Sequence, residues 1–178
     1  MSAHEPVVLS SYSPLWPALF DYERERLARI FPEPGVQVEH IGSTAVPGLG
    51  AKPIIDIMLG VPTLALVELR LDALREDGWR YVPEFEKAFP DRRYFTRTDG
   101  QPGNYQLHAV VTGSPFWRRQ LAFRDALRAD AKLAADYWKL KQRLAARFPN
   151  DREAYASAKS EFVRAALAAA SGQGEPAP

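Results

Sequence analysis

The 178-residue sequence contains no cysteine, which excludes disulfide bonds, thiol nucleophiles and cysteine-ligated zinc or iron–sulfur centres. It also lacks an excess of either charge, because 23 lysine and arginine residues balance 22 aspartate and glutamate residues. The net charge of +1 provides no overall field that would attract nucleic acid or an anionic membrane. We therefore expect neither of these as a partner, and we expect any anion to bind at a local cluster of cations.

Long apolar runs are also missing. No stretch approaches the ~20 apolar residues of a membrane-spanning helix, and the opening MSAHEPVVLSSYSP has neither the basic nor the apolar region of a secretory signal. We therefore expect a cytoplasmic protein. Residues 171–178 are small and polar with proline and glycine, which predicts a disordered tail. Residues 1–170 contain no linker or repeat, which predicts a single domain, and the sequence leaves its oligomeric state open.

The hydrophobic pattern predicts strands mixed with helices up to Thr112 and helices alone after it. Strands are expected at 7–9, 36–41, 54–61, 79–82, 93–98 and 105–112. Helices are expected near 14–31, 63–77, 114–128, 131–147 and 150–169, with Asn150 as the cap of the last one. The run IIDIMLGV at 54–61 is almost wholly apolar, which is typical of a central strand. The order predicts an α+β fold in which helices pack on a mixed sheet.

The residues with the clearest chemistry lie in the segment 38–61, VEHIGSTAVPGLGAKPIIDIMLGV. Gly42 would let the backbone approach a ligand, and Ser43 and Thr44 supply hydroxyl groups and N–H groups at the start of a helical turn. Lys52 adds a compact positive charge. The pattern predicts a phosphate site, and the alternative is that the glycine–serine pair forms only a turn.

Asp56 is the one carboxylate in the strand 54–61. An unpaired buried carboxylate costs several kcal/mol, so Asp56 should be paired, bound to a metal ion or placed at the exposed end of the strand. His40 and His108 are candidate general bases or metal ligands beside it, because imidazole titrates near neutral pH. The alternative for each histidine is a structural hydrogen bond. Glu39 and His40 are consecutive on a strand, so only one of them can face the site.

The helical part of the chain carries many cations, most of which we expect to form surface ion pairs worth less than about 1 kcal/mol each. A few of its residues are candidates for lining a ligand groove on the sheet: Arg124, Lys141, Tyr155 and Lys159. Tyr155 and Lys159 are one helical turn apart and so share a helix face. The aromatic residues of this part are interpreted as core.

Four segments together resemble the GrpB family of small bacterial proteins: HIGSTAVPGLGAKPIIDI (40–57), LHAVVTGSPFWRRQLAFRDALR (107–128), YWKLKQRLAARF (137–148) and YASAKSEFV (155–163). The resemblance covers about residues 6 to 165. That family in turn resembles the nucleotidyltransferase superfamily, whose core is a mixed sheet. A glycine–serine turn there is followed, about a dozen residues later, by an acidic–apolar–acidic strand. Gly42-Ser43 and Asp56 occupy the turn and the first acidic position.

The resemblance implies that a nucleotide or another phosphorylated small molecule binds at the Gly42-Ser43 turn, with Mg²⁺ at Asp56. Two positions depart from the wider superfamily. Met58 stands at the second acidic position, and a thioether is a poor ligand for a hard cation. The strand 105–112 offers Gln106 and His108 but no carboxylate. The carboxylate set is therefore incomplete, which argues against ordinary two-metal nucleotidyl transfer.

Three functions remain as hypotheses. The preferred one is a nucleotidyltransferase-like enzyme, or a degenerate relative, that acts on a phosphorylated small molecule. The second is a non-catalytic nucleotide- or anion-binding regulator, which Met58 and Gln106 favour and which would bind with little dependence on metal. The third is an adaptor that binds proteins through its helical C-terminal half and would expose a large apolar patch there.

Overall fold

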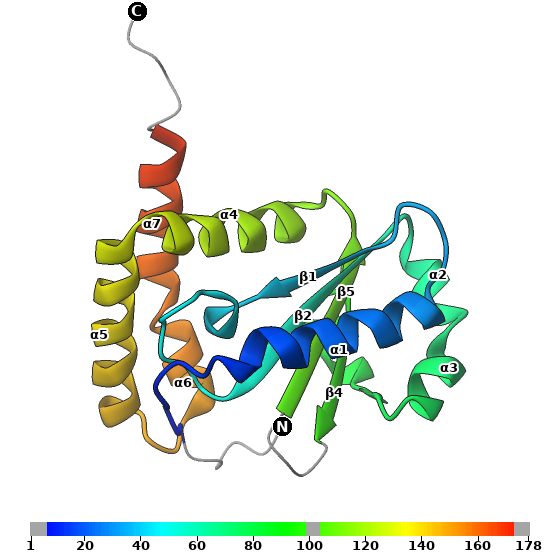
Figure 1. The fold of residues 1–178 in the computed structure, drawn as a ribbon, viewed down its shortest axis with the longest axis horizontal. Coiled ribbons are helices and arrows are strands. Elements are labelled where there is room, and N and C mark those ends of the chain that lie inside the picture. Colours follow the sequence, from blue (N-terminus) through cyan, green and yellow to red (C-terminus); the bar gives the residue numbers. More distant parts are fainter. Residues whose placement is uncertain (1–6, 99–103, 173–178) are drawn as a thin grey trace, which may run out of the picture.

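The computed structural model describes residues 7–98 and 104–172, which form a five-stranded mixed sheet of order β1-β2-β5-β4-β3 (Figure 1). The strands are β1 (Gln37–Ile41), β2 (Ile54–Val61), β3 (Arg80–Tyr81), β4 (Arg92–Thr98) and β5 (Asn104–Val111). Strands β2 and β5 run parallel, and every other pair is antiparallel. The predicted α+β fold with a mixed sheet is confirmed, and the apolar run β2 lies inside the sheet with neighbours on both sides.

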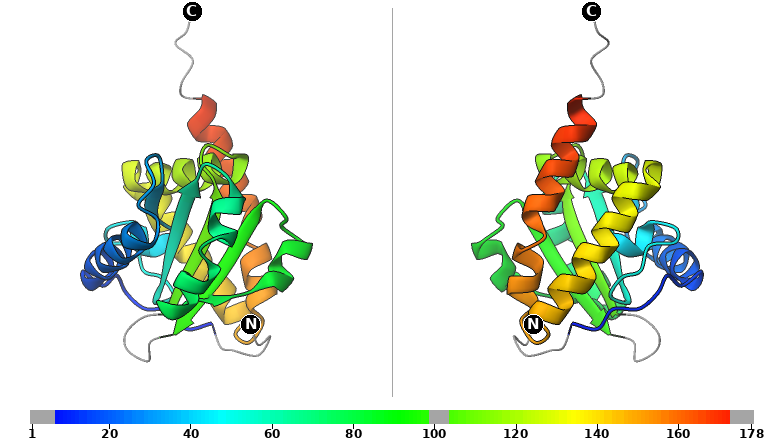
Figure 2. Two further views of the ribbon diagram at one scale, coloured as in Figure 1. Left: turned by 90° about the vertical axis from the view of Figure 1, so that its right-hand side faces the viewer. Right: turned by 90° about the vertical axis from the view of Figure 1, so that its left-hand side faces the viewer.

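Seven α-helices and two short 3-10 helices are described around this sheet. They are α1 (Leu15–Ile30), η1 (Ser43–Ala45), α2 (Leu64–Glu68), α3 (Leu71–Glu76), η2 (Pro83–Lys87), α4 (Pro115–Ala129), α5 (Ala131–Arg147), α6 (Arg152–Ser157) and α7 (Ser160–Gly172). Helices α5, α6 and α7 stand together at the side of the sheet away from α3 (Figure 1), and α1 and α6 lie on opposite sides of it (Figure 2). No helix among the described residues is long and apolar enough to span a membrane.

The largest apolar cluster lies between the sheet and helices α1 to α3, where Leu27, Ile55 and Ile57 are fully buried. Successive side chains of a strand point to opposite faces. Because Ile55 and Ile57 face this core, Asp56 and Met58 point to the other face, where helices α4 to α7 pack. The alternation of β2 therefore decides on which side of the sheet the carboxylate lies.

Two local predictions near the chain ends are wrong. Residues 7–9 form no strand, because the only strand-like pairing in this segment is an isolated bridge between Ser10 and Ala51. The last helical region is capped by Asp151 and not by Asn150, since the Asp151 side chain accepts a hydrogen bond from the backbone N–H of Ala154.

Two predicted helices are each divided. The helix expected at 63–77 is interrupted between α2 and α3, and the one expected at 150–169 is interrupted between α6 and α7. No glycine or proline stands at either interruption, so local propensity gives no sign of them and tertiary packing decides. Helix α7 reaches Gly172, and residues 173–178 of the expected tail lie outside the described residues.

Candidate functional site

The turn after β1 is packed directly against the carboxylate of β2. Gly42 has a φ of 72°, a conformation that side chains disfavour. A Cβ at this position would lie 2.4 Å from Oδ2 of Asp56. The sheet register brings the two together, because Ile41 pairs with Asp56. Glycine is therefore required here both for the backbone conformation and for the close approach of the turn to Asp56.

A hydrogen-bonded network below the turn fixes its shape. The hydroxyl of Thr44 donates to the carbonyl of Ile54 at 3.1 Å, and its oxygen lies 3.0 Å from Nε2 of His40. Because the hydroxyl proton of Thr44 is already donated, His40 must carry its proton on Nε2 and donate it. Arg128 reaches the carbonyl of Ala45 with two N–H groups, at 2.8 and 3.0 Å. The hydroxyl of Thr44 thus holds the turn in place.

His40 and Arg124 do not line the large cavity that lies between the sheet and helices α4 to α7. The His40 ring stacks on Phe20 of α1, with centroids 4.7 Å apart, on the apolar side of the sheet. Burial, with the charges of Arg128 and Arg124, lowers the pKa of His40 to about 4, so the ring is neutral. Glu39 points to the other side and accepts a 2.6 Å bond from Arg124, which also donates to the carbonyl of His40. Both predicted site residues therefore occupy structural positions.

A cavity of about 1190 Å³ opens beside the turn, between the sheet and helices α4 to α7. Its wall contains most of the residues predicted from sequence: Gly42, Ser43, Thr44, Lys52, Asp56, His108, Lys141, Tyr155 and Lys159. They come from the turn, from the loop before β2, from the neighbouring strands β2 and β5, from α5 and α6, and from the break between α6 and α7. The cavity is therefore closed by segments that lie far apart in the sequence.

Asp56 sits among positive charges in this cavity. Burial raises the pKa of its carboxyl to about 6, and the ammonium groups of Lys52 and Lys159 oppose the shift. Burial and the charge of Lys52 lower the pKa of Lys159 to about 8, against the pull of Asp56. Near neutral pH the carboxyl is therefore mostly ionised and Lys159 is mostly protonated.

Two of the cations lie over one buried phenol ring, and a third, Lys141, lies over the ring of Tyr137. The Nζ atoms of Lys52 and Lys159 lie 5.4 and 4.4 Å from the centroid of Tyr155, and burial raises the pKa of that phenol to about 12. Lys141 is buried, donates to the carbonyl of Gly50 and has a pKa lowered to about 7 by burial and by Lys159. We name Lys52, Lys141 and Lys159 the cation cluster. Their mutual repulsion in a buried space would be relieved by an anion.

Sequence reasoning missed several residues of the cavity wall, among them Tyr137, Phe85, Phe89, Tyr94 and Gln120. Tyr137 was interpreted only as core, yet its phenol also shares a side-chain hydrogen bond with Ser43. No pattern in the sequence connects residues of η2 and β4 with the glycine–serine turn.

The residues around Asp56 do not fit a pair of Mg²⁺ ions. Met58, at the second acidic position, is fully buried against Ile41, Val110 and Trp117. Among residues 7–98 and 104–172, no group of three or more histidine, aspartate and glutamate side chains is placed to hold a metal ion. The nearest charged neighbours of Asp56 are lysines, which repel a cation. Two-metal phosphoryl transfer requires several carboxylates, which this arrangement does not supply.

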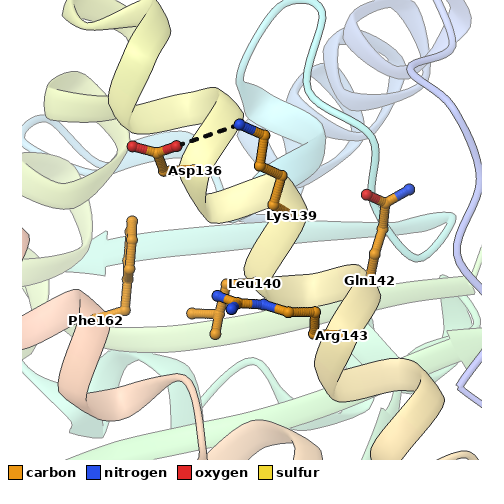
Figure 3. A pocket seen from close by; sticks show the side chains of 6 residues that line it. All are labelled: Asp136, Lys139, Leu140, Gln142, Arg143 and Phe162. Carbon is orange, nitrogen blue, oxygen red and sulfur yellow. Dashed lines mark ion pairs between the residues drawn. The ribbon is translucent and has the colours of Figure 1, made fainter.

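A second hollow of about 490 Å³ lies on the outer surface, between α5 and α7 (Figure 3). It is lined by Asp136, Lys139, Leu140, Gln142, Arg143 and Phe162. Its ion pair between Lys139 and Asp136 spans 3.7 Å, and both side chains are solvent-exposed. Exposed pairs of this kind contribute little energy and hold no fixed geometry, so the candidate site is the larger cavity.

Comparison with known proteins places this chain among relatives along nearly its whole length. Residues 6–169 match the family described as GrpB protein. The chain is 36% identical over 155 residues to the UPF0157 protein YqkA of Bacillus subtilis, covering 87% of this chain but only 44% of that protein. It is 34% identical over 165 residues to the glutamate-rich protein GrpB of Alkalihalophilus pseudofirmus, covering 88% of this chain and 91% of that protein.

Solved structures agree with this assignment. The crystal structure of the conserved protein GrpB from Enterococcus faecalis superposes with a TM-score of 0.82 at 32% identity, over 93% of this chain and 98% of that one. Terminal uridylyl transferase 4 from Trypanosoma brucei, solved with bound dUTP, matches with a TM-score of 0.53 at 12% identity, over 77% of this chain and 46% of that one. At this identity the second match shows the fold alone. The chain therefore belongs to the GrpB protein family and has a fold of nucleotidyltransferase type.

Proposed function

We propose that this protein binds a nucleotide or another phosphorylated small molecule in the large cavity, and that it does so without a metal ion. The observation that carries the proposal is the cation cluster. Lys52 and Lys159 lie over one tyrosine ring beside the Gly42-Ser43 turn. The pKa of Lys141 is lowered to about 7, so this lysine is partly protonated near neutral pH. A phosphate group would neutralise these charges where water screens them least.

The turn supports the same proposal. The Ser43 side chain lines the cavity and offers a hydroxyl hydrogen bond to a phosphate oxygen, next to the backbone of Gly42. Asp56 then serves to hold Lys52 and Lys159 in position, because its carboxylate attracts both ammonium groups and favours the charged form of Lys159. This role needs one carboxylate beside the two lysines and no metal ion.

Nucleotidyl transfer by two metal ions is less well supported, because the described part of the chain places no group of three acidic or histidine side chains where a metal ion could bind. The fold shared with terminal uridylyl transferase does not by itself supply a reaction. The adaptor hypothesis is also less well supported. The large hydrophobic side chains that are exposed among the described residues are Val8, Leu15, Tyr22, Leu69, Phe89 and Val111, and none belongs to α4 to α7.

The test is calorimetric titration of the full chain with AMP, ribose 5-phosphate and inorganic phosphate, each in Mg²⁺ and in EDTA. Loss of a charge-assisted contact costs about 1.5–3 kcal/mol. We therefore expect Lys52→Ala and Lys159→Ala each to weaken binding about 10- to 100-fold. Lys139→Ala is the matched control, because this lysine is on the outer face of α5 and 72% exposed.

The outcomes separate the hypotheses. Binding that is equal in EDTA, lost in the two cavity variants and kept in Lys139→Ala supports the proposal. Asp56→Asn should weaken binding less than Lys52→Ala or Lys159→Ala, and equally in Mg²⁺ and in EDTA, because it leaves both lysines in the site and removes only the carboxylate that favours the charged form of Lys159. If binding instead requires both Mg²⁺ and Asp56, the metal-dependent enzyme hypothesis is correct and the proposal is wrong.

A further inference from the structure

A second group of side chains lines the same cavity, and it comes from η2 and the residues after it, from β4 and from β5. We name Phe85, Phe89, Tyr94 and His108 the aromatic cluster. Its rings form a continuous series: the centroids of Phe85 and Tyr94 lie 4.5 Å apart, those of Phe85 and Phe89 5.2 Å, and those of Tyr94 and His108 5.0 Å. All four residues line the cavity. The cavity thus combines a cationic wall with an aromatic one.

The aromatic cluster is held rigidly on the sheet. Tyr94 and His108 are paired across β4 and β5, and the guanidinium of Arg92 lies 4.4 Å from the ring centroid of Phe89 and 5.1 Å from that of Phe85. Through these contacts, Arg92 of β4 holds Phe85 of η2 and Phe89, which follows η2, against the sheet. Phe89 nevertheless keeps 44% of its surface exposed. An exposed ring held in place beside a cavity is a platform on which a flat molecule can stack.

His108 contributes an unused polar atom to this wall. Its Nδ1 is buried and has no hydrogen-bond partner among the described residues. Burial and the charge of Arg92 lower its pKa to about 3, so the ring is neutral and offers one N–H group and one acceptor nitrogen. The amides of Gln106 and Gln120 line the same cavity and can both donate and accept. A buried polar atom without a partner points to a ligand that supplies one.

Asp56, beside the cation cluster, and His108, in the aromatic cluster, lie close together on neighbouring strands. His108 pairs with Met58, two residues along β2 from Asp56. From the rise of a strand and the spacing between strands, the Cα atoms of Asp56 and His108 are about 8 Å apart. A ribose bridges a gap of this order between a phosphate group and a base.

We propose that the aromatic cluster binds the base of a nucleotide, stacked on Phe89 and hydrogen-bonded to Nδ1 of His108, while the cation cluster binds its phosphate. The inference rests on the proposed function and narrows the expected ligand to a nucleotide. A sugar phosphate or inorganic phosphate would leave the aromatic cluster without a contact. The neutral histidine and the two amides recognise the polar edge of a heteroaromatic ring, which an aliphatic group lacks.

The experiment compares mononucleotides (AMP, GMP, CMP and UMP) with ribose 5-phosphate and with the corresponding nucleosides, by calorimetric titration of the full chain. Stacking on an aromatic side chain changes affinity about 5- to 100-fold per base. We expect at least one mononucleotide to bind more tightly than ribose 5-phosphate by a factor in this range. Phe89→Ala should remove that advantage and leave ribose 5-phosphate binding unchanged. Tyr22→Ala, which removes a 58% exposed ring from α1, is the control.

Each outcome decides one of the two proposals. If all four mononucleotides bind no better than ribose 5-phosphate, the base site is wrong and the phosphate site stands. If nucleosides bind as tightly as mononucleotides and Phe89→Ala weakens both, the base site stands and the phosphate site is wrong. If no phosphorylated compound and no nucleoside binds, both proposals are wrong. His108→Asn, which keeps a polar side chain, should retain more affinity than His108→Leu if the histidine hydrogen-bonds the base.

Discussion

Replacing Asp56 by asparagine should make the protein more stable at neutral pH. The folded protein raises the pKa of this carboxyl from 3.8 to about 6 because the group is buried. The protonated carboxyl therefore stabilises the fold fully below about pH 3.8, and this stabilisation is lost as the pH rises through about 6. Asparagine resembles the protonated form and does not titrate, so it keeps the favourable state at every pH.

The size of the effect follows from the shift. A difference of about two pKa units corresponds to roughly 3 kcal/mol, which is the upper limit for the gain. The attraction of Lys52 and Lys159 is already contained in this shift, and an amide replaces the protonated carboxyl only in part, so the gain falls below the limit. We therefore expect Asp56→Asn to raise the free energy of unfolding by about 1–3 kcal/mol at pH 7 and by progressively less between pH 6 and pH 4.

The assay is urea unfolding at several pH values in buffers free of phosphate and sulfate, because these anions would bind the cation cluster and mask the effect. Asp72→Asn is the control, since its side chain is 82% exposed and its removal should change stability by less than about 0.5 kcal/mol. An Asp56→Asn variant that is less stable at pH 7, or whose effect does not vary with pH, would show that the carboxylate is a structural ion pair and refute the reasoning.

Two further predictions concern the packing of the sheet, and both are measured by urea unfolding. Gly42→Ala should cost more than about 2 kcal/mol, because the new Cβ would meet Asp56 as well as strain the backbone. Gly48→Ala has a φ of 77° but nothing within 4 Å, so it should cost only about 1 kcal/mol, and equal costs would contradict the clash. On the opposite face of the sheet, Glu23→Ala should cost about 3 kcal/mol, because Arg97 would lose its most deeply buried ion-pair partner and keep Asp77, whose side chain is 21% exposed. A change below 1 kcal/mol would show that this pair is energetically neutral.

The site was predictable from sequence where its residues are close along the chain. The pattern of Gly42, Ser43 and Asp56 places a turn against a strand, and the alternation of β2 puts Asp56 on the face opposite Ile55 and Ile57. These are local relations, because a strand has a fixed period of two and a turn needs particular residue types.

The assignment of individual roles was less predictable. His40 and His108 were equivalent candidates in the sequence, yet His40 stacks on Phe20, and His108 lines the cavity with a nitrogen that has no hydrogen-bond partner among the described residues. Their difference comes from which sheet face each occupies and what packs there. No pattern in the sequence specifies the register between β4 and β5, so the neighbours of His108 could not be named.

The family, the mixed α+β architecture, the glycine–serine turn and the methionine at the second acidic position can all be read from the residue order. The closure of the cavity cannot be read from it, because it depends on contacts between distant segments. Lys141 meets Gly50 across 91 residues, and Arg124 meets Glu39 across 85. Contacts of this range depend on how every helix packs on the sheet, which no local pattern specifies, and they bring the cation cluster and the aromatic cluster to the walls of one cavity.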